Sequence, residues 1–222
     1  MKSSLFEDFD ERAQEVSKYF LFLKNLEKGS IKLEMGKENT KIKDIDTELL
    51  KTLKATGFLL LYNLIESTMT NGIEAINDKI KDDQKNFDHL RDELREIIIK
   101  NFKNKSAKDL ARKIQNISVN IVSEGLDNKK MFSGNVNNKV IKELSQSYGF
   151  CAQTHKKNRD GNDLINIKNH RNDLAHGSQS FKEIGRNTTA DELVEIQKRV
   201  VCYLREILLN IENCISNQQY LK

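Results

Sequence analysis

The side chains with the clearest potential for chemistry lie in one six-residue segment (RNDLAH), where Arg171 and His176 flank Asn172 and Asp173. A guanidinium can hold an anionic phosphate through two parallel hydrogen bonds, and an imidazole can gain or lose a proton near neutral pH. Gly177 follows directly, as expected where a helix ends. The pair therefore predicts a site for chemistry on a phosphate, carried on the last turns of a helix.

Helix geometry limits how these side chains can meet. Five residues of an ideal helix span about 7.5 Å and turn the last side chain about 140° from the first, so Arg171 and His176 do not share a face. Asn172 and Asp173 do share a face with His176, and either could orient its ring or bind substrate. The neighbouring His170 is expected on the surface. The alternative is an ordinary helix end, in which basic side chains compensate the helix dipole.

Two polar residues interrupt the most apolar stretch of the chain, residues 57–66 (GFLLLYNLIE). Asn63 and Glu66 stand three residues apart there, and a helix this apolar is expected to be buried. A buried polar group needs a hydrogen-bond partner, because burial without one is costly. We expect Arg171 and His176 to be these partners, Glu66 for a cation and Asn63 for either. The alternative is an internal hydrogen bond unrelated to function.

The elements that position these residues are all expected to be helices. The chain contains no proline, the strongest helix breaker, and no alternating stretch long enough to predict a strand. A Ser-x-x-Glu capping box opens the first helix at Ser4, and a Thr-x-x-Glu box opens the last at Thr189. The expected helices cover residues 4–28, 46–81, 87–102, 106–122, 136–148, 162–176 and 189–216. Loops are expected at 31–44, 124–135 and 150–161. We therefore expect one all-α domain over residues 1–222, with no β-sheet of consequence.

Composition excludes several classes of function. The 222 residues carry a formal net charge of +4, which permits contact with nucleic acid without demanding it. No apolar run approaches the roughly 18 residues of a membrane span, and the chain opens on amphipathic sequence, so we expect a cytoplasmic protein without membrane contact. The 3 cysteines and 4 histidines form no recognisable metal motif. Walker, Rossmann and nucleophile-elbow motifs are absent too, so no metal or other cofactor is expected.

Several segments, taken in order along the chain, resemble those of HEPN domains. Residues 171–176 fit the Arg-x4–6-His motif of that family. Supporting segments stand at residues 61–66 (LYNLIE), 132–136 (FSGNV), 148–149 (YG) and 177–185 (GSQSFKEIG). In this combination the chain is similar, over most of its length, to the MAE branch of HEPN-like nucleases.

The resemblance implies an all-α, HEPN-like helical bundle with additional helices, assembled as a homodimer. Active members of the family are metal-independent endoribonucleases of toxin–antitoxin, phage-defence and RNA-processing systems. Carried over by position, Arg171 and His176 are the catalytic pair, and Asn172 is the polar residue that follows the arginine. Asn63 or Glu66 is a supporting polar residue from an earlier helix. Two copies of the motif commonly meet in one cleft across the dimer interface, which would remove the difficulty of diverging side chains.

The function we expect is cleavage of RNA by the neighbouring 2′-OH, which leaves a 2′,3′-cyclic phosphate. His176 acts as general base or acid, and Arg171 binds the scissile phosphate and stabilises the charge of the transition state. Lys182 and Arg186, close behind the motif, are candidate contacts to RNA phosphates.

This expectation describes a toxin or phage-defence effector with RNA as its substrate and an antitoxin or defence-system protein as a partner. One alternative is a non-catalytic HEPN module that binds RNA, a nucleotide or a protein. A third reading is a helical scaffold protein in which the Arg-His pair is incidental.

Overall fold

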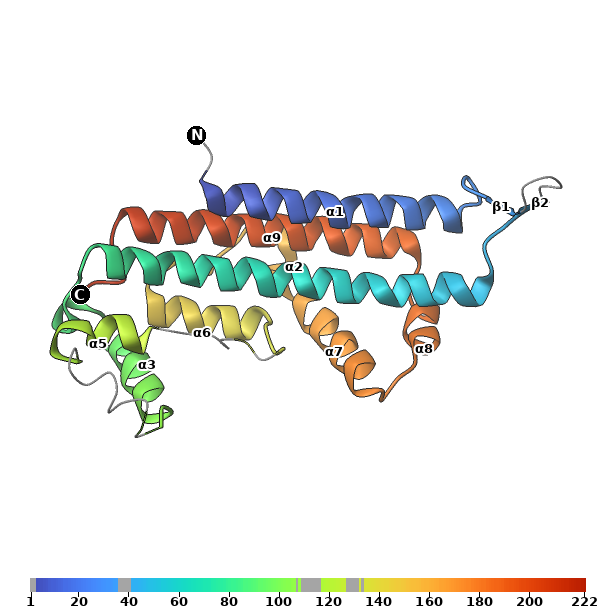
Figure 1. Cartoon of the computed structure of the whole chain (residues 1–222). Coiled ribbons are helices and arrows are strands. Elements are labelled where there is room, and N and C mark those ends of the chain that lie inside the picture. The colour runs from blue at the N-terminus through green and yellow to red at the C-terminus, as the bar shows by residue number, and fades with distance from the viewer. Residues whose placement is uncertain (1–2, 36–40, 107, 109–116, 127–131, 133) are drawn as a thin grey trace.

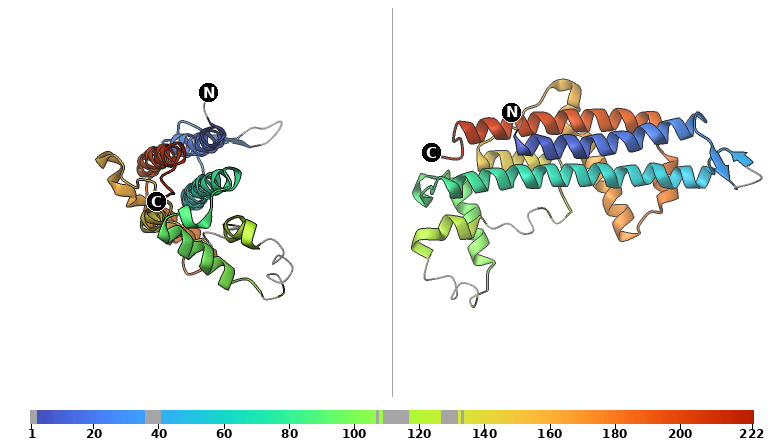
Figure 2. Two further views of the ribbon diagram at one scale, coloured as in Figure 1. Left: turned by 90° about the vertical axis from the view of Figure 1, so that its left-hand side faces the viewer. Right: turned by 45° about the horizontal axis from the view of Figure 1, so that its top comes forward.

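Three long helices lie side by side along most of the length of the molecule (Figure 1). The protein is seen in a computed structural model, which describes residues 3–35, 41–106, 108, 117–126, 132 and 134–222. The long helices are α1 (Ser4–Glu27), α2 (Thr47–Asp82) and α9 (Ala190–Ser216). Viewed along their common direction they form a triangle, in which each helix contacts the other two (Figure 2).

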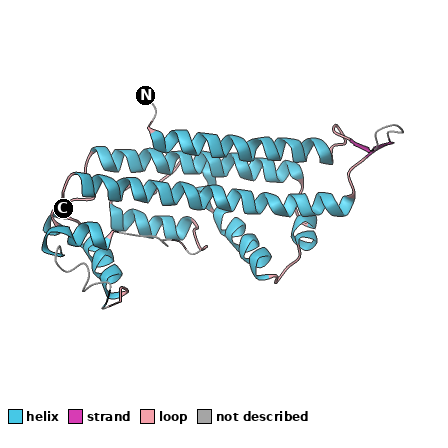
Figure 3. Ribbon diagram, in the orientation of Figure 1, coloured by secondary structure: helices cyan, strands magenta, loops and turns pink. Residues whose placement is uncertain are grey.

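Strands in the described parts of the chain are limited to one hairpin at an end of the long helices (Figure 3). β1 (Leu33–Met35) and β2 (Lys41–Lys43) pair antiparallel, with Glu34 opposite Ile42. The hairpin lies within residues 31–44, where a loop was expected. Its strands have only three residues each, too few to show an alternating pattern in the sequence. The expectation of an all-α fold with no β-sheet of consequence is confirmed.

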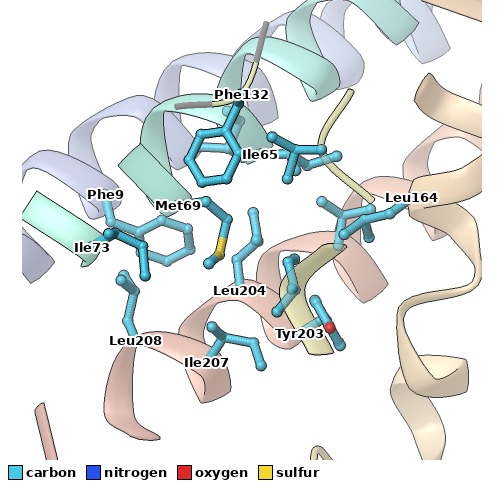
Figure 4. Packing of buried hydrophobic residues seen from close by; sticks show 14 of the residues in the cluster. Phe9, Ile65, Met69, Ile73, Phe132, Leu164, Tyr203, Leu204, Ile207 and Leu208 are labelled. Carbon is cyan, nitrogen blue, oxygen red and sulfur yellow. The ribbon is translucent and has the colours of Figure 1, made fainter. Parts of the chain in front are cut away.

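Apolar side chains at helical spacing fill the space between the long helices. Figure 4 shows part of this core, with residues of α1 (Phe9), α2 (Ile65, Met69, Ile73) and α9 (Leu204, Ile207, Leu208). Burying each such side chain stabilises the fold by about 1.5–3 kcal/mol. Phe132, from the connection between two shorter helices, reaches into the same core and is also buried.

Shorter helices surround the long ones. They are α3 (Asp92–Lys103), α5 (Ile117–Gly125), α6 (Asn138–Tyr148), α7 (Asp163–His176) and α8 (Phe181–Arg186), with the 3-10 helices η1 (Phe87–His89) and η3 (Lys156–Gly161). Helices α7 and α8 leave the long helices as a V, and both contact α2 (Figure 1). The segment of chemical interest occupies the last two turns of α7.

Two contacts set the direction of α7. Near its start, Arg199 of α9 donates two hydrogen bonds to the carboxylate of Asp163, at 2.6 and 3.1 Å. About two turns further on, the ring of His170 lies 4.5 Å from the ring of Phe58 in α2, centroid to centroid. The expected surface position of His170 is wrong, because its ring is half-buried between the two helices. Helix α7 is thus fixed at its start and in its middle.

The start of α1 differs from the expected one. The Ser4 capping box is absent: α1 begins at Ser4 itself, and the hydroxyl of Ser3 donates to Glu212 of α9 instead of capping the helix. The capping box at Thr189 is confirmed. The expected helix at residues 106–122 lies largely outside the described residues, and α5 covers its end.

In the described segments, no helix combines the length and the apolar character that crossing a membrane requires.

Candidate active site

The guanidinium of Arg171 lies over the aromatic ring of Tyr62, with its central carbon 4.9 Å from the ring centroid. Arg171 comes from α7 and Tyr62 from the middle of α2, so this contact joins the two helices at the motif. A cation over an aromatic face is attracted by the ring quadrupole, and the planar guanidinium also stacks well on it. The side chain of Arg171 is therefore directed onto α2 rather than into solvent.

A short backbone segment, residues 134–136, lies beside this stack and is bound to α2. The amide of Gly134 donates to Glu66 Oε1 at 3.1 Å, and the amide of Val136 donates to the Tyr62 hydroxyl at 3.1 Å. That hydroxyl in turn lies 3.4 Å from Glu66 Oε1, to which it donates. Phe132, buried in the core, anchors the chain just before the segment. Tyr62 and Glu66 thus hold the backbone that borders Arg171.

Gly134 is the point where this backbone meets the guanidinium. Its φ is +80°, a conformation that favours glycine, and a Cβ placed there would lie 2.5 Å from Arg171 Nη1 and 2.9 Å from Nη2. Real Cβ atoms do not approach a nitrogen so closely. Only glycine at position 134 leaves room for the observed position of Arg171.

Asn172 connects Arg171 to the same segment. Arg171 Nη1 donates to Asn172 Oδ1 at 3.1 Å, and Asn172 Nδ2 donates to Asn135 Oδ1 at 3.4 Å. Among the described residues, nothing accepts a hydrogen bond from Nε or Nη2 of Arg171. These donors stay available for an anion, and two such donors are the arrangement that binds a phosphate oxygen pair.

His176 is the last residue of α7, and its side chain is exposed. No residue that the structure describes forms a hydrogen bond with its ring. Asn172, which was expected to orient the ring, contacts Arg171 and Asn135 instead. Arg171, by contrast, is half-buried against α2. The two side chains therefore diverge within one chain, as helix geometry predicts.

Asp173 binds the turn that follows His176. Its carboxylate accepts hydrogen bonds from Ser178 Oγ at 3.0 Å and from Gln179 Nε2 at 3.2 Å. Its backbone carbonyl accepts from the amide of Gly177, which closes α7 in a left-handed conformation. Asp173 thus stabilises the turn between α7 and α8. Among the described residues, no hydrogen bond joins its carboxylate to His176, so its role in orienting that ring stays a prediction.

Helix α8 was not expected, although the sequence contains its signal. Ser180 and Glu183 form a capping box, and α8 then packs so closely that a Cβ on Gly185 would lie 1.8 Å from the carbonyl oxygen of Lys51. Phe181–Arg186 is only six residues long, too short to show a helical period. The helix returns the chain from the motif to the start of α2.

The two candidate RNA contacts lie on α8 and differ in their surroundings. Lys182 forms an ion pair with Glu48 of α2, a carboxylate that it shares with Lys51, so its charge is compensated in part. Arg186 is exposed, and within the described structure it has no acidic partner within 4.0 Å. Of the two, Arg186 has the freer charge for a phosphate.

The prediction for Asn63 and Glu66 is correct only in part. Asn63 is exposed, in a groove between α1 and α2 that Tyr19 also lines, so the expectation of its burial is wrong. It stands one residue, and hence about 100° around α2, from Tyr62 and faces away from α7. Glu66 is half-buried beside the motif, but no ion pair joins it to Arg171 among the described residues. It reaches Arg171 indirectly, because it accepts hydrogen bonds from Tyr62 and Gly134, which both contact the guanidinium.

Tyr62, Gly134 and Asn135 are the residues that reasoning from spacing missed. In the sequence, Tyr62 is one more apolar position of a buried helix, and nothing local marks it as a partner of Arg171. Burial raises the pKa of the Tyr62 hydroxyl, an effect that the hydrogen bond from Val136 opposes. The hydroxyl therefore stays protonated at neutral pH and can donate to Glu66.

In the described ranges of the chain, no three His, Cys, Asp or Glu side chains gather into a group that could hold a metal ion.

Comparison with known proteins agrees with the resemblance found in the sequence. The family model described as MAE_28990-like HEPN matches residues 1–220. Neither a curated protein nor a solved structure matches the chain. The matched range includes the three segments that meet at Arg171: 61–66, 134–136 and 171–176. The chain therefore belongs to the MAE_28990-like HEPN family.

Proposed function

We propose that this protein is a metal-independent endoribonuclease that acts as a toxin or phage-defence effector. One observation carries the proposal. The guanidinium of Arg171 is held on Tyr62, its Nε and Nη2 donors have no acceptor among the described residues, and His176 stands exposed at the end of the same helix. A fixed anion-binding group and an accessible proton-transfer group are the two parts that cleavage of a phosphodiester requires.

The proposed reaction uses the 2′-OH of the RNA as its nucleophile. The 2′ oxygen forms a bond to phosphorus while the bond from phosphorus to O5′ breaks. A base removes the proton from the 2′-OH and an acid supplies one to O5′, which gives a 2′,3′-cyclic phosphate and a 5′-OH. His176 takes one of these proton-transfer roles. Arg171 binds the non-bridging oxygens, whose charge grows in the transition state, and Asn172 holds Arg171.

The diverging directions of Arg171 and His176 support a homodimer with a composite site. A second copy related by a twofold axis would bring its own Arg171 and His176 to the same cleft. Two His176 rings would then be available, one as base and the other as acid. RNA is the proposed substrate, and an antitoxin or defence-system protein is the proposed regulator. The proposed location of the protein is the cytoplasm.

The test is cleavage of a 5′-labelled single-stranded RNA by purified protein in the presence of EDTA. Wild type should cut the RNA and leave the matching DNA strand intact, because DNA lacks the nucleophile. The new 3′ end should resist phosphatase until acid opens the cyclic phosphate. Arg171→Ala and His176→Ala should each lower the rate by about 100-fold or more.

Matched controls separate this activity from a contaminant. His89→Ala and Arg12→Ala remove the same side-chain types from exposed positions outside the site and should leave the rate unchanged. Equal cleavage by wild type, Arg171→Ala and His176→Ala would refute the proposal. RNA binding without cleavage by wild type would favour the non-catalytic HEPN module instead.

A further inference from the structure

We propose that Tyr62 and Gly134 are positioning residues that set where the Arg171 guanidinium meets the phosphate. The inference deepens the proposed function and rests on it for its catalytic meaning. The geometric part, that these two residues determine the orientation of the guanidinium, can be tested without any RNA.

Three contacts restrict the guanidinium in three different directions. The Tyr62 ring lies under its face, 4.9 Å from the central carbon. The backbone at Gly134 borders the edge formed by Nη1 and Nη2, so that a Cβ there would come within 2.9 Å of both nitrogens. Asn172 Oδ1 accepts the hydrogen bond of Nη1 at 3.1 Å. With face, edge and one nitrogen fixed, Nε and Nη2 point in one set of directions.

Tyr62 contributes through two separate parts of its side chain. The ring carries the guanidinium, whereas the hydroxyl accepts the amide of Val136 and donates to Glu66 Oε1. Glu66 Oε1 also accepts the amide of Gly134 at 3.1 Å. The same residue therefore supports the guanidinium from below and fixes the backbone that borders its edge.

Such restriction matters because an arginine side chain is long and loses much rotamer freedom when it binds an anion. Holding the guanidinium before the substrate arrives removes part of that loss and keeps the donors in a productive position. Displacing it should weaken transition-state binding even though Arg171 itself is intact. A merely structural glycine or tyrosine would change stability without this effect.

The first experiment compares Gly134→Ala with Gly29→Ala. Both glycines have a positive φ, +80° and +67°, so alanine strains the backbone in both variants. The Cβ at position 29 meets nothing within 4 Å, whereas the Cβ at position 134 meets Arg171. We expect kcat/KM for RNA to fall at least about tenfold in Gly134→Ala and to stay unchanged in Gly29→Ala. Thermal unfolding midpoints of the two variants should drop by similar amounts.

The second experiment separates the ring of Tyr62 from its hydroxyl. Tyr62→Phe keeps the surface under the guanidinium but loses the hydrogen bonds to Val136 and Glu66, and Tyr62→Leu loses both. We expect kcat/KM to decrease in the order wild type, Tyr62→Phe, Tyr62→Leu, with the loss mainly in kcat. Equal activity of Tyr62→Leu and wild type would overturn the inference.

The third readout does not need RNA cleavage. In a 15N-labelled sample, Hε of Arg171 should be shifted upfield by the ring current of Tyr62, with the resonance assigned by its loss in Arg171→Lys. The shift should persist in Gly29→Ala and disappear in Tyr62→Leu and Gly134→Ala. Absence of the shift in wild type, or its retention in Gly134→Ala, would overturn the positioning role. If the shift behaves as expected while wild type cuts no RNA, the proposed ribonuclease activity fails and the positioning of Arg171 stands.

Discussion

At the scale of single residues, Arg171 and His176 are held in opposite ways. Arg171 is restricted by Tyr62, Gly134 and Asn172, whereas the exposed ring of His176, at the end of α7, forms no hydrogen bond with the residues that the structure describes. This difference suits the roles proposed for them, because an anion-binding group gains from being fixed before the reaction, whereas a proton-transfer group must reach the substrate.

Replacing Arg171 by lysine tests whether geometry or charge alone is needed. Lysine keeps the positive charge but offers a point charge in place of a flat fork that stacks on Tyr62 and binds two oxygens. We expect Arg171→Lys to lower kcat/KM for RNA by about 10-fold to 100-fold with an unchanged unfolding midpoint. Arg12→Lys, on the exposed face of α1, is the matched control and should keep full activity. Full activity in Arg171→Lys would show that charge alone suffices.

Much of this site could be predicted from the sequence, and the rest depends on tertiary contacts. The spacing of Arg171 and His176 and the cap at Gly177 follow from helical geometry, which is local. The contacts of Arg171 with Tyr62 and Gly134 join residues far apart in the chain, and no local pattern encodes them. The predicted contact of Asn63 with Arg171 or His176 is wrong, because Asn63 lies one position after Tyr62. That single step turns its side chain by about 100°, from the face toward α7 to the groove beside α1.

At the scale of secondary-structure elements, α7 is held by α9 and α2 along its first half, and its last turns carry the motif. The ion pair between Asp163 and Arg199 and the packing of His170 on Phe58 hold it, whereas beyond Arg171 the helix extends to the tip of the V. Most long helices were predicted within a few residues, because their apolar period is strong. Short elements such as α8 and the β1–β2 hairpin were missed, since three to six residues contain too little pattern.

The packing of His170 makes the stability of α7 sensitive to pH. Burial lowers the pKa of His170 from its ordinary 6.5, and nearby Asp173 opposes part of this shift. The unfolded chain therefore binds the proton more readily than the folded one, so the contribution of His170 to the free energy of unfolding falls as pH drops below about 6.5. We expect His170→Phe to lose less stability than wild type between pH 8 and pH 5.5 in urea unfolding. Parallel curves for the two proteins would contradict this expectation.

At the scale of the whole molecule, one carboxylate joins the three long helices. Glu27, at the end of α1, accepts a hydrogen bond from Lys54 of α2 at 3.0 Å and from the first amide of α9, that of Ala190, at 2.6 Å. Lys54 is only 8% exposed, and its ammonium donates to Glu27 instead of to water. These hydrogen bonds lie near the end of the three-helix bundle where α8 packs against α2.

Glu27→Gln should destabilise the whole protein. It leaves the ammonium of Lys54 buried without its counter-charge, and removing one partner of a buried pair costs about 3–5 kcal/mol. Because Glu27 is itself partly exposed, we expect a smaller loss, about 2 kcal/mol in the free energy of unfolding. Glu74→Gln, at an exposed position of α2, is the control and should change stability by no more than about 0.5 kcal/mol. Adding Lys54→Met to Glu27→Gln should recover part of the loss.

The proposed homodimer can be tested by mixing inactive subunits. Arg171→Ala and His176→Ala each lack one half of the site, but a mixed dimer contains one intact Arg171 and one intact His176. After unfolding and refolding together, about half of the dimers should be mixed, and RNA cleavage should return in part. No recovery, with mixed dimers demonstrated by differently tagged subunits, would show that one Arg171 and one His176 from different chains do not make an active site. The single domain expected over residues 1–222 stays a prediction that limited proteolysis can check.

The close approach of Gly134 to Arg171 also has a genetic consequence. If expression harms the host, survivors of a selection will carry inactivating substitutions, and position 134 should be found among them together with positions 171 and 176, because any replacement of glycine adds a Cβ against the guanidinium. The restriction is conditional. Once Arg171 has been lost, the three atoms that a Cβ at position 134 would meet first are gone and the positive φ remains, so substitutions there become better tolerated. The two positions should therefore show strong epistasis in a deep mutational scan, although they belong to different elements of the fold.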